Sequence, residues 1–365
     1  MRAVLAAALA GMIAAGPAAA QDPGAALAAV LDTATETYPV KAVLAGVAIG
    51  DAAPTLAARG ESMTGVPASP EMHFRNGAVA IAYLGTVLLQ QAEAGVVGLD
   101  DPLSRWFPEH PRAEEVTLAM LIRGTSGYAD YVTDAGFLRA LLDDPFRAWT
   151  PKELIAIGLG QPMRCDPGSC WSYAHTNFVI LGEVLAAAAG RPLADLIREG
   201  IVEPLGLTGT RSDQTAAIPE PVLHAFARER GLYEESTFWN PSWTLAEGAV
   251  MTSTIADLLT SARALGEGTL VSEASHAQQF SPVTADLPPW NADRWYGMGH
   301  FVSNGWIVQN PSFAGYAATM AYLPAQQIAI AVAVTVTEVG DPDYNYSSDI
   351  LGEIAAALAP DAPLR

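Results

Sequence analysis

Residues 78–94 read AVAIAYLGTVLLQQAEA, and this segment limits the possible folds more than any other part of the chain. Its composition favours a helix, and apolar side chains lie on nearly every side of that helix. A helix without a polar face is typical of the middle of a protein, where other elements surround it. The rest of the chain must therefore cover this segment on all sides.

The segments around this helix predict strands at both ends of the chain and helices between them. Residues 42–49 and 53–58, joined by Gly50-Asp51, have the pattern of a β-hairpin. Strand-like segments return near the other end, at 296–308, 315–323 and 327–337, before a closing helix at 347–359. Helical patterns fill the interval at 115–123, 133–143, 151–158, 176–189, 192–200 and 254–265. We therefore expect an α/β (α+β) fold, with one discontinuous layer and an inserted helical domain.

The first twenty residues, MRAVLAAALAGMIAAGPAAA, predict a secretory signal peptide cleaved before Gln21. A membrane anchor is the alternative, but the apolar stretch is short and is interrupted by glycine and proline. No later segment offers about 18 uninterrupted apolar residues, so we expect no transmembrane segment in the mature chain, 21–365. These features predict a periplasmic or secreted protein.

The two cysteines, Cys165 and Cys170, lie five positions apart in CDPGSC. Export permits disulfides, and the Pro-Gly pair between the cysteines favours a turn that brings the sulfurs together. We expect a disulfide that closes a small loop. Two cysteines alone do not make a structural zinc site, and the six histidines lack ligand spacing, so no metal is expected.

Charge and missing motifs exclude several functions. The chain carries 39 acidic and 19 basic residues, for a net charge of −20, and has no basic run. It is therefore a poor binder of nucleic acid. The sequence contains no P-loop, dinucleotide-binding loop, His-Glu-x-x-His helix or Gly-x-Ser-x-Gly elbow, and we expect no cofactor.

Six segments follow one another along residues 30–358: HFRNGAVAIAYLGTVLLQQAEAGVVGLDDPLSRWFP, LIRGTSGYADY, PGSCWSYAHTNFVILGEVL, VEPLGLTGT, NPSWTLAEGAVMTSTIADL and GYAATMAYLP. Together they resemble class C serine β-lactamases, D-alanyl-D-alanine carboxypeptidases and the related family VIII-type esterases. The resemblance implies an antiparallel sheet flanked by helices, formed by about 30–75 and 290–360. It also implies a mostly helical insert at about 76–289, with the active site at the boundary between the sheet and this insert.

The first motif of that family is Ser-x-x-Lys at the start of the buried helix, where residues three apart share one face. Here the corresponding residues are Ala78-Val79-Ala80-Ile81. The hydroxyl and the ammonium group are both lost. The chain has only two lysines, Lys41 and Lys152, and neither follows a serine at that spacing.

The second motif, Tyr-x-Asn, corresponds to Tyr173-Ala174-His175. In active relatives the tyrosine is thought to act as a base, but an ordinary phenol has a pKa of about 10 and is protonated near neutrality. We therefore favour Tyr173 as a hydrogen-bonded residue lining the cleft over a residual base. His175 is either a titrating group in the site or simply accommodated in an aromatic loop.

The third motif, His-x-Gly or Lys-Thr-Gly, corresponds to Gln309, Asn310 and Pro311, counted back from Gly315-Tyr316. An amide replaces the cationic or imidazole donor, and proline removes a backbone N–H at the strand edge. Ser126, in the Thr-Ser-Gly loop, is a further substrate-binding candidate and a weak candidate nucleophile.

These changes lead to three hypotheses. We favour a catalytically degenerate member of the fold that binds peptidoglycan peptide, a β-lactam-like or small ester ligand, or a periplasmic protein. The alternative is an active hydrolase (a peptidase, esterase or amidase) with altered catalytic residues around Tyr173 and His175. A purely structural or complex-forming role is the third, and a large exposed apolar patch would indicate it.

Overall fold

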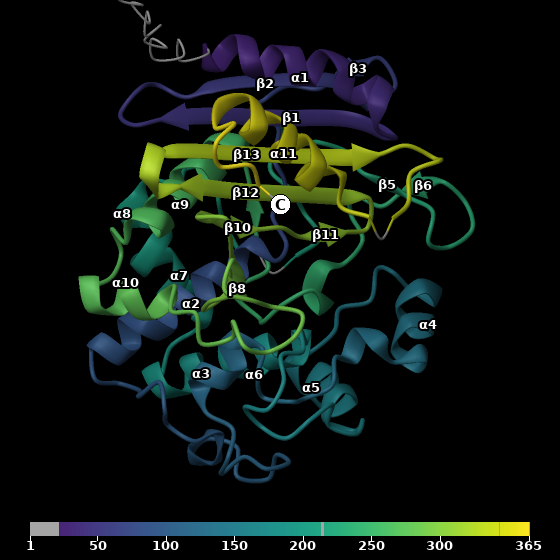
Figure 1. Ribbon diagram of the computed structural model, residues 1–365. Coiled ribbons are helices and arrows are strands. Elements are labelled where there is room, and N and C mark those ends of the chain that lie inside the picture. The colour runs from purple at the N-terminus through teal and green to yellow at the C-terminus, as the bar shows by residue number, and fades with distance from the viewer. Residues whose placement is uncertain (1–21, 213–214, 343, 365) are drawn as a thin grey trace, which may run out of the picture.

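The computed structural model describes residues 22–212, 215–342 and 344–364. In this part of the chain, one large sheet carries helices on both faces, and a mostly helical part adjoins one edge of the sheet (Figure 1). The predicted signal peptide, 1–20, lies outside the described residues.

The sheet joins the two ends of the chain, as predicted. β1 (Val40–Ile49) pairs antiparallel with β13 (Ile328–Val336), in a register that places Val43 opposite Val334. β2 (Thr55–Met63) pairs with the other edge of β1 and confirms the predicted hairpin. The strand order is β3-β2-β1-β13-β12-β10-β9-β8, with β11 paired to β12. The remaining bounds are β3 (Val66–Pro67), β8 (Arg294–Tyr296), β9 (Phe301–Ser303), β10 (Trp306–Gln309), β11 (Ser312–Phe313) and β12 (Tyr316–Leu323).

The two faces of the sheet bury alternate residues of the central strands, as the two-residue period of a strand requires. Val43 and Val334 pack with α1 (Pro23–Thr37) and α11 (Tyr346–Leu358) on one face. Leu44 and Ala333 face the other side, where α9 (Ile255–Glu267) packs. Because both faces are covered, β12 and β13 are buried along their whole length.

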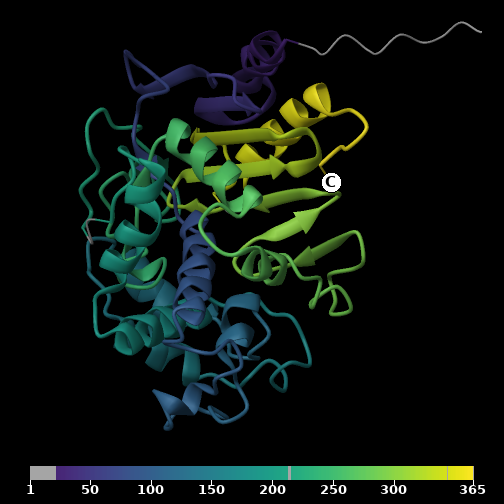
Figure 2. The same ribbon diagram turned by 90° about the vertical axis from the view of Figure 1, so that its left-hand side faces the viewer.

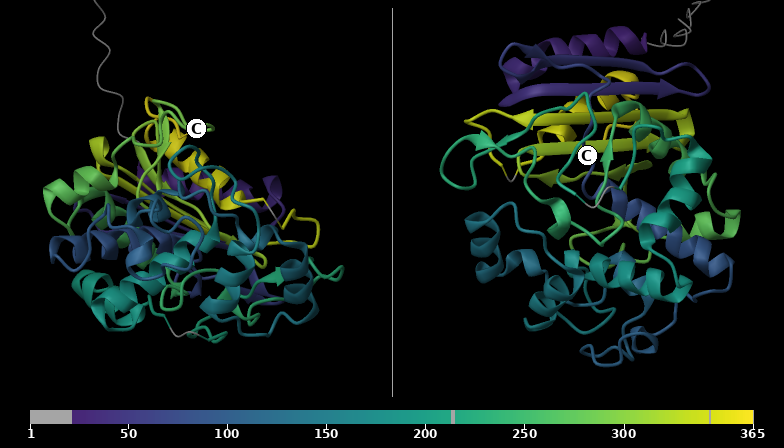
Figure 3. Two further views of the ribbon diagram at one scale, coloured as in Figure 1. Left: turned by 90° about the horizontal axis from the view of Figure 1, so that it is seen from below. Right: turned by 180° about the vertical axis from the view of Figure 1, so that it is seen from behind.

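The apolar segment forms α2 (Val79–Glu93), which is buried on every side from Val79 to Leu89. Figure 2 shows α2 in the middle of the molecule, between the sheet and the other helices. The helical part contains α3 (Leu118–Arg123), α4 (Ala135–Asp143), α5 (Pro151–Leu159), α6 (His175–Ala189), α7 (Leu193–Ile197) and α8 (Glu203–Leu205). α10 (Glu273–Gln279) also packs against α2. From behind, the helical part lies at the end of the molecule opposite α1 (Figure 3).

The structure differs from the sequence-based elements in three places. The single strand expected at 296–308 is three short strands, because residues 297–300 turn against α2 and Asn304-Gly305 turns between β9 and β10. At the first turn, the carbonyl oxygen of Met298 lies 2.2 Å from where a Cβ on Gly85 would stand, so the contact with α2 requires glycine there. Helix α1 was not expected at all. The third difference is α9, which packs mainly on the sheet, against β13, β12 and β1, and makes a smaller contact with α8 of the insert.

Two smaller features complete the fold. Cys165 and Cys170 form the predicted disulfide. Two short strand pairs, β4 (Phe74–Arg75) with β7 (Thr252–Ser253) and β5 (Phe226–Ala227) with β6 (Glu234–Glu235), lie outside the main sheet. Among the described residues, no helix combines the length and apolar character needed to cross a membrane.

Candidate active-site cleft

The N-terminus of α2 lies at the edge of a cleft of about 350 Å³, between the helical part and the β10–β11 end of the sheet. Ala78 is the N-cap residue of α2, lines the cleft, and makes no side-chain capping hydrogen bond. Ile81 follows one turn later and is fully buried in the main apolar core. The two positions at which the family resemblance expects a hydroxyl and an amine therefore carry a methyl group at the cleft and an aliphatic side chain beneath it.

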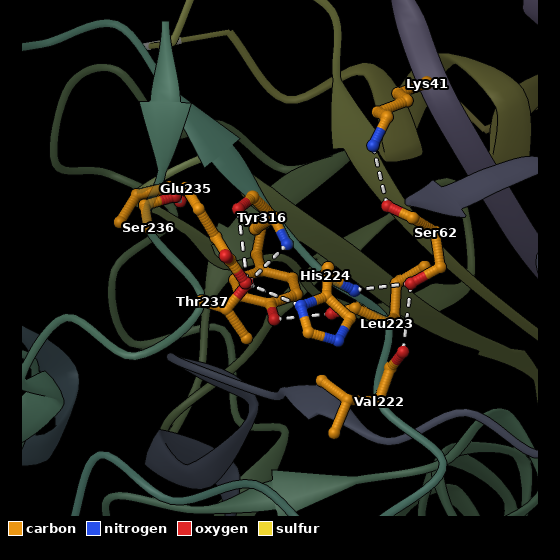
Figure 4. A network of polar contacts seen from close by, with 11 residues as sticks. Lys41, Ser62, Val222, Leu223, His224, Glu235, Ser236, Thr237 and Tyr316 are labelled. Carbon is orange, nitrogen blue, oxygen red and sulfur yellow. Dashed lines mark hydrogen bonds and ion pairs between the residues drawn. The ribbon is translucent and has the colours of Figure 1, made fainter. Parts of the chain in front are cut away.

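Neither lysine supplies the missing amine. The Lys41 Nζ atom donates to the backbone oxygen of Ser62 at 2.7 Å (Figure 4). The same atom lies 3.9 Å from the centre of the Phe226 ring. Lys152 is exposed in the first turn of α5. Neither of the two is among the residues that line the cleft.

Tyr173 lines the cleft just before α6 begins. Burial raises the pKa of its phenol well above the ordinary value, and the neighbouring Tyr296 and Asp130 side chains act in the same direction. The hydroxyl of Tyr173 therefore stays protonated near neutral pH and acts as a hydrogen-bond donor. This protonation state opposes the use of Tyr173 as a base.

His175 also lines the cleft, at the first position of α6. Its Nδ1 atom lies 2.9 Å from the Oδ2 atom of Asp130, whose side chain is only 9% exposed. The second carboxylate oxygen of Asp130 accepts a hydrogen bond from the backbone N–H of Val132. The ring of His175 packs near the rings of Tyr131, Tyr173 and Trp243. The imidazole is thus held by a carboxylate on one side and by aromatic rings around it.

Gln309, Asn310 and Pro311 lie together along the cleft at the end of β10. The Gln309 side chain is buried, donates to the backbone oxygen of Gly299 and accepts from the N–H of Asn310. Pro311 lies close to Gly77, next to the N-terminus of α2: a Cβ on Gly77 would stand 2.6 Å from the Cβ of Pro311. The proline therefore narrows the cleft beside Ala78.

Ser126 lies behind the cleft and does not line it. It is fully buried, and its hydroxyl donates to Asn177 Oδ1 at 2.6 Å. Ser126 therefore lies apart from the other predicted site residues, and its hydrogen bond to Asn177 helps to hold α6 in place.

Several residues that line the cleft were missed by sequence reasoning: Trp171, Trp290, Arg294, Tyr296, Phe301 and Ser312. Most of them come from 290–301, WNADRWYGMGHF, where the density of aromatic residues in one loop was the available signal. Asp130 was also missed, although it stands in the quoted segment LIRGTSGYADY. Within the described residues, no group of three or more His, Cys, Asp or Glu side chains has a geometry suited to a metal ion.

Comparisons with known proteins identify relatives of the chain. The chain is 27% identical over 238 residues to the putative penicillin-binding protein PbpX of Bacillus subtilis, covering 65% of this chain and 55% of that protein. It is 25% identical over 298 residues to the D-alanyl-D-alanine-carboxypeptidase/endopeptidase AmpH of Escherichia coli K12, covering 76% and 74%. The chain spans about half the length of the first curated relatives it matches.

Solved structures with the same fold include two amide hydrolases. A D-stereospecific amidohydrolase from Streptomyces matches with a TM-score of 0.79 and 25% identity, over 92% of this chain and 99% of that chain. The D-amino acid amidase of Ochrobactrum anthropi SV3 matches with a TM-score of 0.81 and 20% identity, over 93% and 99%. The family model described as Beta-lactamase matches residues 9–351. The chain therefore belongs to the β-lactamase family, whose relatives here are penicillin-binding proteins and similar serine hydrolases.

Proposed function

We propose that this protein is an exported member of the β-lactamase family that binds its ligand without forming an acyl-enzyme. The observation that carries the proposal is the pair Ala78 and Ile81, at the start of the buried helix α2. A methyl group has no nucleophilic atom, and a buried aliphatic side chain cannot activate one. In a well-studied serine protease, loss of the nucleophile lowers turnover by a factor on the order of 10⁶.

The preserved cleft supports binding as the remaining role. Its lining combines aromatic side chains with a few polar groups, which is the usual composition of small-molecule sites. The ligand classes we propose are peptidoglycan peptides, β-lactam-like compounds, small esters and amino-acid amides, with a periplasmic protein as the macromolecular alternative. Amino-acid amides enter the proposal because the Ochrobactrum anthropi enzyme of the same fold is a D-amino acid amidase with a phenylalanine amide in its structure.

The proposal is tested by offering penicillin, nitrocefin, a D-Ala-D-Ala peptide and short esters to the wild type and to the Ala78→Ser/Ile81→Lys double variant. We expect no covalent penicilloyl mass on the wild type and no turnover of any of the four substrates. A stoichiometric acyl adduct on the wild type would overturn the proposal. Activity confined to the double variant would show that the first motif alone accounts for the loss.

One observation favours a second candidate function, an active hydrolase with altered catalytic residues. His175 is held by Asp130, and a carboxylate-oriented imidazole is a common general base. In that function His175 would take a proton from water as the oxygen attacks a carbonyl carbon, and return it to the leaving group. Hydrolysis of an ester or amide by the wild type that is abolished by His175→Gln would establish this function, and hydrolysis abolished by Tyr173→Phe would point to the tyrosine.

A further inference from the structure

Two polar groups of the cleft without a hydrogen-bond partner are suited to recognising a ligand. Among the described residues, neither the Tyr173 hydroxyl nor the His175 Nε2 atom has a hydrogen-bond partner, and both residues line the cleft. Their rings pack edge to face, with centroids 5.1 Å apart. The two side chains therefore border the same part of the cleft.

The two groups have opposite hydrogen-bonding roles. The Tyr173 phenol stays protonated and donates. A carboxylate oxygen accepts only, so the Nδ1 atom of His175 must carry the hydrogen that points at Asp130. In the neutral ring this leaves Nε2 as an acceptor. The cleft thus presents a donor and an acceptor side by side, where the asparagine expected at position 175 would offer an amide that can do either.

We propose that Tyr173 and His175 together recognise a carboxamide, and that Asp130 is the positioning residue that fixes the acceptor. The carbonyl oxygen of the amide accepts from the Tyr173 hydroxyl, and its N–H donates to His175 Nε2. The aromatic residues Trp171, Trp290 and Tyr296 line the rest of the cleft and suit an apolar or aromatic substituent. This inference rests on the proposed binding function and names its ligand class.

Asp130→Asn is the decisive variant, because the structure fixes which way the new amide lies. The backbone N–H of Val132 donates to Asp130 Oδ1 and will hold the carbonyl oxygen of the asparagine in that place. The NH₂ group then faces His175 and donates to Nδ1, so the hydrogen moves to Nε2. The variant keeps the shape of the site and turns the acceptor into a donor.

The change of His175 Nε2 from acceptor to donor can be measured with two isosteric ligands. 3-Phenylpropanamide and 4-phenylbutan-2-one differ only in an NH₂ group against a methyl group, and both keep the carbonyl. By calorimetry at pH 8.5, where imidazoles are generally neutral, we expect the wild type to bind the amide roughly fivefold to tenfold more tightly than the ketone. Asp130→Asn should abolish this preference. Tyr173→Phe should weaken both probes and keep the ratio, because both use the carbonyl.

A second measurement does not depend on any ligand. The ¹⁵N shifts of His175, assigned by their loss in His175→Gln, should report hydrogen on Nδ1 in the wild type and on Nε2 in Asp130→Asn. Asp143→Asn, at the exposed end of α4, removes the same charge outside the cleft and should change neither the tautomer nor the ratio.

Three outcomes would overturn the inference. The first is a wild-type His175 with hydrogen on Nε2, the second is a wild type that binds neither probe at millimolar concentration, and the third is a wild type that binds both probes equally. An acyl adduct with penicillin would overturn the proposed function instead, and the tautomer and the amide preference are measured independently of it.

Discussion

The hydroxyl of Ser126 donates to the side-chain oxygen of Asn177 at 2.6 Å, and both residues are fully buried. The same hydroxyl accepts from the backbone N–H of Tyr128. Asn177 stands two positions after His175 on α6, and Tyr128 stands two positions before Asp130. The contact between Ser126 and Asn177 therefore ties together the two segments that carry the Asp130–His175 pair, and gives the serine a structural role.

Ser126→Ala should destabilise the protein by about 1–3 kcal/mol, because it leaves the buried Asn177 oxygen and the Tyr128 N–H without a partner. Chemical denaturation measures the change. Ser169→Ala is the matched control, since the Ser169 hydroxyl is exposed and donates to the backbone oxygen of Asp166, and this substitution should cost less than about 0.5 kcal/mol. A fluorophosphonate label that disappears in Ser126→Ala would contradict the structural role.

Ile81→Lys should destabilise the protein by about 3–5 kcal/mol at pH 7, because the ammonium group would enter the apolar core without a partner. An unfolded lysine has a pKa of about 10.4, and burial lowers the pKa in the folded state, so the unfolded state binds the proton more tightly. The free energy of unfolding of the Ile81→Lys variant should therefore rise in part between pH 7 and pH 10.

Ile81→Met controls for the loss of the isoleucine shape and should cost less than about 1.5 kcal/mol at both pH values. The expectation fails if the lysine variant is as stable as the methionine variant at pH 7. That result would mean that the lysine side chain reaches the cleft, and the first motif would then be restorable by substitution alone.

His300 should make the protein sensitive to acid. It is 1% exposed, and burial, with a contribution from His276, lowers the pKa of His300 to about 3. The unfolded residue titrates near 6.5, so between these two values the unfolded state binds a proton that the folded state does not. The free energy of unfolding should therefore fall by about 3 kcal/mol between pH 7 and pH 4 on account of this residue.

His300→Gln removes the titrating group and should flatten this acid slope, even if the variant is less stable than the wild type at pH 7. Urea unfolding at a series of pH values measures both slopes. Equal acid slopes in the two proteins would show that other groups cause the acid sensitivity.

The hairpin, the buried helix and the closing strands were predictable because each has a local pattern that burial reinforces. The breaks inside 296–308 were not, since they arise where residues 297–300 turn against α2, and that contact joins segments about two hundred positions apart. Asn304-Gly305 is a recognisable hairpin signal, and giving it more weight would have found the second break.

The candidate site was also predictable only where local sequence patterns define it. The motif positions Ala78, Tyr173, His175 and Pro311 follow from the order of the segments, and all four line the cleft. The partner of His175 does not follow from it, because Asp130 lies 45 positions away and only the folded loop brings its carboxylate to the imidazole. The aromatic residues of 290–301 that line the cleft likewise could not be assigned to it, because their position depends on how that loop folds.

The contact between Gly77 and Pro311 offers a test of the shape of the cleft. Gly77 has a φ of +45°, and a Cβ placed on it would stand 2.6 Å from the Pro311 Cβ, too close for any real pair of carbons. Gly77→Ala should therefore destabilise the protein by about 2–4 kcal/mol, from the left-handed backbone and the collision together.

Pro311→Gly removes the collision and leaves the backbone cost of Gly77→Ala, about 1 kcal/mol. In a double-mutant cycle measured by denaturation, the two substitutions should therefore be coupled by about 1–2 kcal/mol, with the double variant more stable than the sum of the single losses predicts. Additive losses would mean that the strand carrying Pro311 moves away from Gly77 at little cost. In that case Pro311 would not narrow the cleft beside Ala78. The proline of the third motif would then not limit the access of a ligand to the start of α2.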